Sequence, residues 1–162
     1  MTTRTTLITG ANRGLGLQTA RVLAKRGYRV LLGSRTLEKG EAVAAELREQ
    51  GGDVRAVSLD VEDPASITAC LEALRAETLH VDVLVNNAGR PGGGATAELA
   101  DELWLDVVET NLTGVFRVTK QVLKAGGMLE RGTGRIVNIA STGGKQGVVH
   151  AAPYSASKHG VV

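Results

Sequence analysis

One stretch near the start of the chain, Thr9 to Gly16, constrains the fold more than any other. It reads Thr-Gly-Ala-Asn-Arg-Gly-Leu-Gly, follows the short apolar run from Thr5 to Ile8, and opens an amphipathic segment from Leu17 to Arg26. This order predicts a strand, a tight loop and a helix. Glycines at this spacing let the backbone turn sharply and approach an anion, and the helix N-terminus offers free N–H groups to a phosphate. No Lys followed by Ser or Thr comes after the last glycine, which argues against a nucleoside-triphosphate site; an ordinary glycine turn is the alternative.

The composition favours a sheet that is buried on both faces. Hydrophobic residues make up 43% of the 162 residues but aromatic residues only 2%, so the core must consist of Val, Leu, Ile and Ala. That is typical of a parallel sheet covered by helices. The 21 glycines fall where strands would end, and we interpret them as loop residues. A single domain, 1–162, accounts for this length.

Charge and apolar patterning exclude several classes of partner. The net charge is +2 and basic residues are scattered among acidic ones, unlike the one-sided basic surface of a nucleic-acid-binding protein. No apolar run approaches a membrane span, so we expect a cytoplasmic protein with neither nucleic-acid nor membrane partners. The single cysteine, Cys70, shares a helical spacing with Ile67 and Leu71; we expect it in the core, and we predict no metal site.

Apolar runs and periodic segments alternate along the chain. Strands are predicted at 5–8, 29–33, 53–59, 81–85 and 135–139, and helices at 17–26, 38–50, 63–77 and about 103–123, with another helix beginning near Tyr154. Such alternation predicts an α/β fold, a Rossmann-like doubly wound parallel sheet with strand order 3-2-1-4-5 and helices on both faces.

A glycine loop between a strand and a helix is typical of dinucleotide-binding folds. In such folds the residues at the end of the second strand indicate whether NAD or NADP binds. An acidic residue about 20 residues after the glycine loop favours NAD, but this chain has Ser34 and Arg35 there. Arg35, together with Arg13 from the loop, can bind a 2′-phosphate that a carboxylate would repel, which favours NADP(H). Taken singly, each arginine is equally a solvated surface charge. Asp60, at the end of the third strand, either lies near an adenine or caps a loop or helix.

Polar residues follow the fourth strand. Asn86 and Asn87 lead into Ala88 and Gly89, and their amides need partners, local or on a ligand, because an unpaired buried amide costs about 1–3 kcal/mol. Asn111 falls on a predicted apolar helical face and is either a satisfied core asparagine or part of a site.

Three residues near the end of the chain suggest acid catalysis by a phenol. Ser141 follows the fifth strand, and Tyr154 and Lys158 are four residues apart in a predicted helix, which places them on one face. A tyrosine that donates a proton near neutral pH needs a lowered pKa. A lysine ammonium one helical turn away can lower it, because the positive charge favours the ionised phenol. Alone, the pair is more simply interpreted as a surface Tyr–Lys pair.

Together, in order and spacing, these motifs resemble the short-chain dehydrogenases/reductases. The resemblance implies that Tyr154 is the proton donor, that Ser141 orients the carbonyl, that Lys158 holds the nicotinamide ribose and that Asn111 supports a water-linked proton relay. The cofactor-binding set that follows from the motifs and this resemblance is Thr9, Gly10, Asn12, Arg13, Gly14, Leu15, Gly16, Arg35, Asp60, Val61, Asn87, Ala88, Gly89, Tyr154 and Lys158.

From about residue 81 onward, the loop Arg90 to Gly94 and the segment Asn138 to Gly147 resemble the polyketide ketoreductases of this family. The resemblance implies a substrate site formed by Pro91, Gly92, Gly93, Ser141 and Tyr154. It also implies a small-molecule ketone as substrate, free or as a polyketide on a carrier protein, in antibiotic biosynthesis. The first 80 or so residues are more similar to carbonyl-reductase-like members, which suggests a hybrid chain.

Members of this family are longer than this chain, so the resemblance implies a domain that is incomplete at its C-terminus. The parts expected to be missing are the sixth and seventh strands, the rest of the Tyr154 helix and half of the usual subunit interface. We therefore expect a weakened homo-oligomer, a fifth strand that is exposed at the sheet edge, and activity far below that of a complete enzyme.

The sequence thus predicts NADPH-dependent reduction of a ketone. One alternative is a non-catalytic NADP-binding fragment of such an enzyme; another is a sugar-nucleotide epimerase, which would need a substrate domain. His80, His150 and His159 are interpreted as surface or loop residues.

Overall fold

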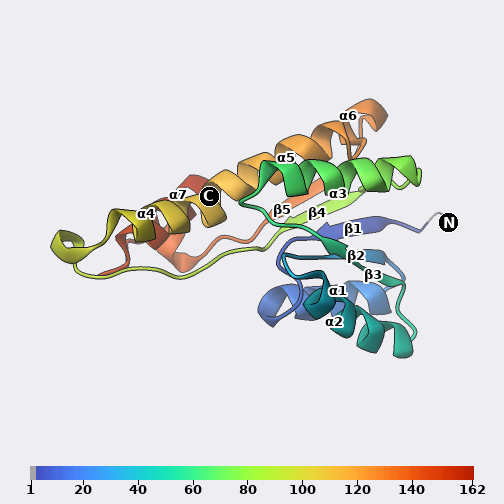
Figure 1. Ribbon diagram of the computed structural model, residues 1–162, viewed down its shortest axis with the longest axis horizontal. Coiled ribbons are helices and arrows are strands. Elements are labelled where there is room, and N and C mark those ends of the chain that lie inside the picture. Colours follow the sequence, from blue (N-terminus) through green and yellow to red (C-terminus); the bar gives the residue numbers. More distant parts are fainter. Residues whose placement is uncertain (1–2) are drawn as a thin grey trace.

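A five-stranded parallel sheet forms the centre of the computed structural model, which describes residues 3–162 (Figure 1). The strands are β1 (Thr5–Ile8), β2 (Arg29–Ser34), β3 (Val54–Ser58), β4 (Val83–Asn86) and β5 (Arg135–Asn138). They lie in the order β3-β2-β1-β4-β5, and every pairing is parallel. The predicted order is confirmed. Between β1 and β4 the order of strands reverses, which is where open sheets of this kind bind ligands.

Helices cover both faces of the sheet (Figure 1). One face is covered by α1 (Gly14–Lys25) and α2 (Leu37–Glu49), and the other by α3 (Pro64–Ala76) and α5 (Gly114–Lys124). The short α6 (Met128–Arg131) follows α5. Two further helices, α4 (Asp101–Val108) and α7 (Ala152–Val161), extend beyond the carboxyl ends of the strands.

Side chains of the central strands alternate between two apolar cores, because successive residues of a strand point to opposite faces. Leu7, Leu31 and Leu84 stand in register and pack with α3 and α5. Their neighbours Ile8 and Leu32 pack with α1 and α2. No aromatic side chain belongs to either buried core among residues 3–162, as the composition predicts.

Cys70, a residue of α3, lies in the core as predicted. It is 8% exposed and packs in the cluster that contains Ile67 and Leu71. Burial raises the pKa of the Cys70 thiol to about 11, against a smaller opposing effect of Arg55. A thiol with so little thiolate near neutrality is a poor nucleophile.

Three details of the fourth strand and the following helix differ from the sequence prediction. β4 begins at Val83, so Val81 precedes it as a fully buried core residue. The long predicted helix is interrupted by a π-helical turn, Glu109–Thr113, between α4 and α5. The apolar spacing of the predicted helix includes Trp104 and Phe116, but these side chains are 40% and 62% exposed. Apolar spacing alone does not reveal such a break, because it assumes a constant helical period.

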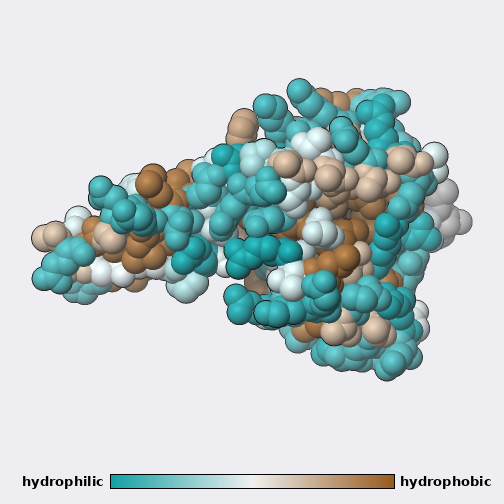
Figure 2. Space-filling view, in the orientation of Figure 1, coloured by the Kyte–Doolittle hydropathy of each residue, from teal (hydrophilic) through white to brown (hydrophobic). Residues whose placement is uncertain are grey.

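Exposed apolar surface gathers away from the two cores. β5 pairs with β4 alone among the described strands, and all four of its residues are exposed, as predicted for a sheet edge. Apolar side chains also reach the surface on the extension that carries α4 and α7 (Figure 2). Within residues 3–162, no helix is long and apolar enough to cross a membrane.

Candidate active site at the carboxyl ends of the strands

The glycine loop after β1 has the tight geometry that its sequence predicts. Gly10 and Gly14 have φ angles of +61° and +57°, a region that costs other residues energy. A Cβ atom on Gly10 would lie 3.0 Å from the Ala88 Cα atom, and one on Gly16 would lie 2.4 Å from the Asn87 Nδ2 atom. The loop therefore runs directly against the segment that follows β4.

Thr9 joins these two segments. Its hydroxyl oxygen accepts hydrogen bonds from the N–H groups of Asn87 and Ala88, both at 2.9 Å. In return the Asn87 side-chain amide donates to the carbonyl oxygens of Thr9 and Gly10, at 2.9 and 3.1 Å. The Asn87 amide, which the sequence analysis left to a local or a ligand partner, thus has local partners.

A cleft of about 640 Å³ opens beside this junction. It brings together most of the predicted cofactor-binding set: Gly10, Asn12, Arg13, Gly14, Leu15, Arg35, Asp60, Val61, Asn87, Ala88 and Gly89. Thr9 and Gly16 do not line it, because they are packed behind the loop. Tyr154 and Lys158 lie in a neighbouring cavity instead.

The cleft is suited to phosphate. The N-terminus of the twelve-residue α1 faces the loop, and no acidic residue lies in its first turn, so its free N–H groups and its dipole favour an anion. Arg13 and Arg35 both line the cleft. Neither arginine forms an ion pair within residues 3–162.

Asp60 combines the two alternatives that the sequence left open. Its carboxylate accepts a hydrogen bond from the Glu62 N–H at 3.0 Å, which is a loop-capping role. The same residue also lines the cleft.

A second cavity, of about 780 Å³, adjoins the cleft and contains the predicted proton donor. Tyr154 and Lys158 line it together, as their spacing on α7 predicts. Pro91, Gly92 and Gly93 form another part of its wall. Five residues line both spaces and so connect them: Leu15, Asn87, Gly89, Arg90 and Pro91.

Lys158 is held in a buried position beside the end of β5. It is 6% exposed, and its ammonium group donates to the Ile139 carbonyl oxygen at 2.7 Å. Burial lowers the pKa of Lys158 from its usual value of 10.5, because a charge loses hydration in a low-dielectric environment.

Asn111 is fully buried in the π-helical turn. Its side chain accepts from the Arg90 N–H at 2.8 Å and donates to the Arg90 carbonyl oxygen at 3.0 Å. It also donates to the Ser157 hydroxyl at 3.2 Å. Asn111 is therefore a satisfied buried asparagine that also fixes the start of the loop from Arg90 to Gly94; π-helical turns often occur at functional sites.

Ser141 is not among the residues that line the second cavity. Its hydroxyl accepts from the Gly143 N–H at 3.1 Å and so caps the 3-10 turn Thr142–Gly144. A Cβ atom on Gly143 would lie 3.3 Å from the Tyr154 ring, so the turn that Ser141 caps packs against the predicted proton donor. The sequence correctly places Ser141 near this end of the sheet, but its hydroxyl already has a local partner.

The prediction omitted several lining residues. Leu59, Glu62 and Thr110 line the cleft, and Ile139, Ala140, His150 and Ala151 line the second cavity. Proximity to the ends of β3 and β5 could have indicated four of these. The placement of Thr110 and His150 depends on the π-helical turn and on the path of the chain before α7, which carry no sequence signal.

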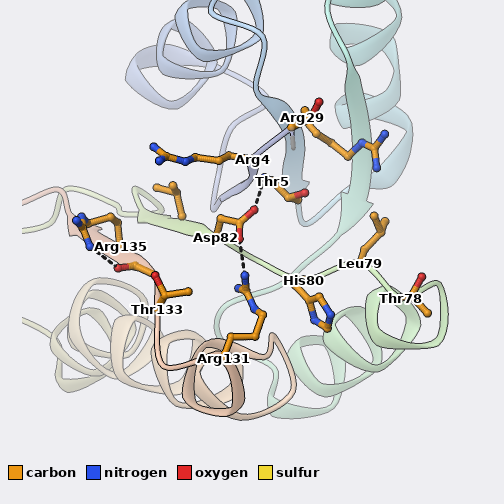
Figure 3. Close-up of a pocket in the computed structure, with 13 residues that line it drawn as sticks. Arg4, Thr5, Arg29, Thr78, Leu79, His80, Asp82, Arg131, Thr133 and Arg135 are labelled. Atoms are coloured by element: carbon orange, nitrogen blue, oxygen red, sulfur yellow. Dashed lines mark hydrogen bonds and ion pairs between the residues drawn. The ribbon is translucent and has the colours of Figure 1, made fainter. Parts of the chain in front are cut away.

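Another cavity, of about 560 Å³, lies at the opposite, amino end of the strands and is separate from the predicted chemistry (Figure 3). At its centre the Asp82 carboxylate accepts from the Thr5 N–H at 2.8 Å and pairs with Arg131 at 2.6 Å. These bonds join β1, the start of β4 and α6. We interpret this group as a structural brace.

Comparison with known proteins identifies the family. The sequence profile of the short chain dehydrogenases matches residues 4–162. The chain belongs to the short-chain dehydrogenase family. Within residues 3–162, no group of three or more His, Cys, Asp or Glu residues could hold a metal ion.

Two similar proteins come from Streptomyces. The protein named "Putative ketoacyl reductase" of Streptomyces coelicolor is 69% identical over 156 residues, which are 96% of this chain and 60% of that protein. The "Granaticin polyketide synthase putative ketoacyl reductase 1" of Streptomyces violaceoruber is 62% identical over 156 residues, or 96% of this chain and 57% of that protein.

A solved short-chain dehydrogenase structure shares the fold closely. It is a crystal structure of an actinorhodin polyketide ketoreductase variant with NADPH, 67% identical, with a TM-score of 0.94 over 98% of this chain and 61% of that chain. The chain thus spans about 60% of the length of the relatives that it matches. The match to the Streptomyces coelicolor protein covers 96% of this chain. One relative therefore matches both the first 80 or so residues and the rest of the chain, and the hybrid origin stays a prediction.

Proposed function

We propose that this chain binds NADPH in the cleft and contributes the proton-donating site for reduction of a ketone in the second cavity. The observation that carries the proposal is that the two spaces are connected. The glycine loop with Arg13, together with Arg35 after β2, lines one of them, and neither arginine forms an ion pair within residues 3–162. Tyr154 and Lys158 line the other, and five residues line both. The ketoacyl reductase names of the relatives and the NADPH in the solved structure support it.

The cleft fits the dinucleotide. A side chain on Gly10 would come within 3.0 Å of Ala88, so glycine there lets the loop pack closely against the segment after β4. A pyrophosphate in the cleft would bind beside the N-terminus of α1. Arg13 and Arg35 would bind the 2′-phosphate. Bound NADPH would supply the hydride that adds to the carbonyl carbon.

The chain's own residues supply the proton. Tyr154 donates its phenolic proton to the ketone oxygen as negative charge develops there, and the product is an alcohol. The Lys158 ammonium, one helical turn away, favours the resulting phenolate. Asn111 holds the main chain of Arg90 and so fixes the wall of the cavity. The predicted water-linked relay through Asn111, and the carbonyl-orienting role of Ser141, remain part of this proposal.

Cofactor choice is tested by titrating NADPH and NADH and following the fluorescence of the reduced cofactor. We expect NADPH to bind more tightly than NADH. Arg35→Ala should weaken NADPH binding by about 10- to 100-fold, the effect of losing one charge-assisted contact, and leave NADH binding unchanged. Arg26→Ala removes an exposed arginine that lies outside the cleft and is the matched control. Equal binding of both cofactors would contradict the assignment.

Catalysis is tested by NADPH oxidation with a ketone substrate. Tyr154→Phe should lower the rate by a factor of about 100 or more, whereas Tyr28→Phe, just before β2, should not change it. A Tyr154→Phe variant with full activity would refute the proton-donor role. NADPH binding without any turnover would favour the alternative that this chain is a non-catalytic NADP-binding module.

A polyketide ketone, free or carried by a protein, is the substrate that we propose, because two relatives have ketoacyl reductase names and one of these belongs to a polyketide synthase. Assays with a free ketone and with its carrier-bound form would distinguish the two.

We propose self-association through exposed apolar surface, tested by sedimentation at several protein concentrations.

A further inference from the structure

The loop that borders the second cavity, Arg90 to Gly94, has no regular secondary structure, yet its backbone is attached at both ends. At its start, Arg90 exchanges two main-chain hydrogen bonds with the buried side chain of Asn111. At its end, the Gly94 N–H donates to the His150 carbonyl oxygen at 2.7 Å. The loop is therefore held between the π-helical turn and the segment that leads into α7.

The glycine at position 93 is required by this second attachment. A Cβ atom there would lie 2.0 Å from the His150 carbonyl oxygen and 2.9 Å from the Ala151 Cα atom. No such contact is tolerated, and the atoms in the way are main-chain atoms that cannot rotate aside. By contrast, Gly147, in the same region, has nothing within 4 Å of its Cβ position.

The carbonyl that accepts this bond is held in an unusual backbone conformation. His150 has a φ angle of +56°, in the left-handed region that residues other than glycine seldom adopt. Residues persist in such conformations where the surrounding structure determines them, and they cluster at functional sites. α7 begins two residues later, at Ala152, and carries Tyr154.

We propose that the main-chain carbonyl of His150 is a positioning group that fixes the Arg90–Gly94 loop relative to Tyr154, and that Gly93 is glycine because this contact leaves no room for a side chain. The inference rests on the proposed ketone reduction for its consequence. Because the loop and α7 form adjoining walls of one cavity, the bond sets the space in which a ketone can lie beside the phenol. His150 acts through its backbone, and its imidazole ring is not required.

Amide hydrogen exchange, followed by NMR, tests the bond itself. The Gly94 amide should be protected in the unchanged chain, and its exchange should become about tenfold faster in Gly93→Ala, as expected for loss of a local hydrogen bond. Gly147→Ala should leave it unchanged. His150→Asn should preserve the protection, since asparagine tolerates the left-handed region. Unchanged Gly94 protection in Gly93→Ala would overturn the proposal.

Two readouts show that the Gly93→Ala chain still folds. The core amide of Leu31 in β2 should stay protected, and the NADPH dissociation constant should stay within about twofold, because Gly93 does not line the cofactor cleft. Faster exchange of the Leu31 amide as well would mean general unfolding and would overturn the local role.

Turnover tests the consequence for the reaction. A displacement of about 1 Å can reduce a rate about 100-fold, so we expect Gly93→Ala to lower kcat by that order while Gly147→Ala leaves it unchanged. Full kcat in Gly93→Ala would overturn the positioning role. If the unchanged chain reduces no ketone, the proposed function fails, but the exchange experiment still decides whether the His150 bond holds the loop.

Discussion

Thr9 shows how a single side chain can organise the site without lining it. It is 1% exposed, and its hydroxyl oxygen accepts two main-chain hydrogen bonds from the segment after β4. Both the glycine loop and the Asn87–Gly89 wall of the cleft depend on this junction. A residue behind a binding site can thus determine its shape.

Thr9→Val keeps the shape of the side chain and removes the acceptor. It should lower the free energy of unfolding by about 2–4 kcal/mol, because two N–H groups lose their partner. Thr9→Ser keeps the hydroxyl and should cost less than half as much. Urea denaturation of both variants measures the difference, and equal losses would show that packing, not hydrogen bonding, is responsible.

Burial of Lys158 predicts a pH dependence of stability. Because its pKa in the folded chain is lowered from 10.5, the unfolded chain binds more protons between the lowered value and 10.5. The contribution of Lys158 to the free energy of unfolding therefore rises with pH through that window and is least favourable below it.

Lys158→Met removes this titration. The difference in unfolding free energy between the unchanged chain and this variant should shift in favour of the unchanged chain as the pH rises toward 10.5. Lys39→Met, an exposed lysine on α2, should show no such trend. Denaturation curves at several alkaline pH values provide the test, and a difference that does not vary with pH would contradict the expected burial effect.

At the scale of elements, β5 and α7 have unlike environments. Although α7 is short, its residues Ser155, Ser157 and Lys158 are buried, and Lys158 lines the second cavity. β5 leaves Ile136 and Val137 at 38% and 45% exposure on the sheet edge. Exposed apolar edges pair readily with other chains.

Val137→Lys should therefore reduce self-association, because lysine on an edge strand opposes strand pairing. Val22→Lys changes a valine of similar exposure, 48%, on the helix α1 and is the matched control. Light scattering during incubation at increasing concentration measures the effect. If Val137→Lys and Val22→Lys reduce scattering equally, the added charge explains the reduction, and the edge of β5 has no special role in self-association.

At the scale of the whole molecule, the candidate site and the structural brace lie at opposite ends of the sheet. The carboxyl ends hold the cleft and the cavity with Tyr154, while the amino ends hold the brace of Asp82, Arg131 and Thr5. The strands that separate these two ends are four to six residues long. We therefore expect that stability and cofactor binding can be altered separately.

Asp82→Ala should lower the free energy of unfolding by about 1–3 kcal/mol, since it removes an acceptor for a main-chain N–H and for an arginine. Its NADPH dissociation constant should stay within about twofold. Arg35→Ala should behave in the opposite way, with weaker NADPH binding and unchanged stability. Thermal unfolding and cofactor titration of both variants test this separation, and weakened NADPH binding in Asp82→Ala would contradict it.

Local patterns in the sequence determined the elements and their order. Strand–loop–helix alternation predicted the five strands and the sheet order, because each short apolar run can be satisfied only inside a parallel sheet covered by helices. The glycine spacing located the tight loop between β1 and α1, and Tyr154 and Lys158 share a face because helical geometry is local. The family followed from these motifs in their order.

Only the tertiary structure decided how those motifs meet. The π-helical turn places Asn111 on the main chain of Arg90. The left-handed conformation of His150 and its bond to Gly94 depend on two segments more than 50 residues apart. Contacts of this kind involve main-chain atoms, which every residue has, so side-chain patterns could not predict them. They arise only when the packed sheet and helices bring those backbones together.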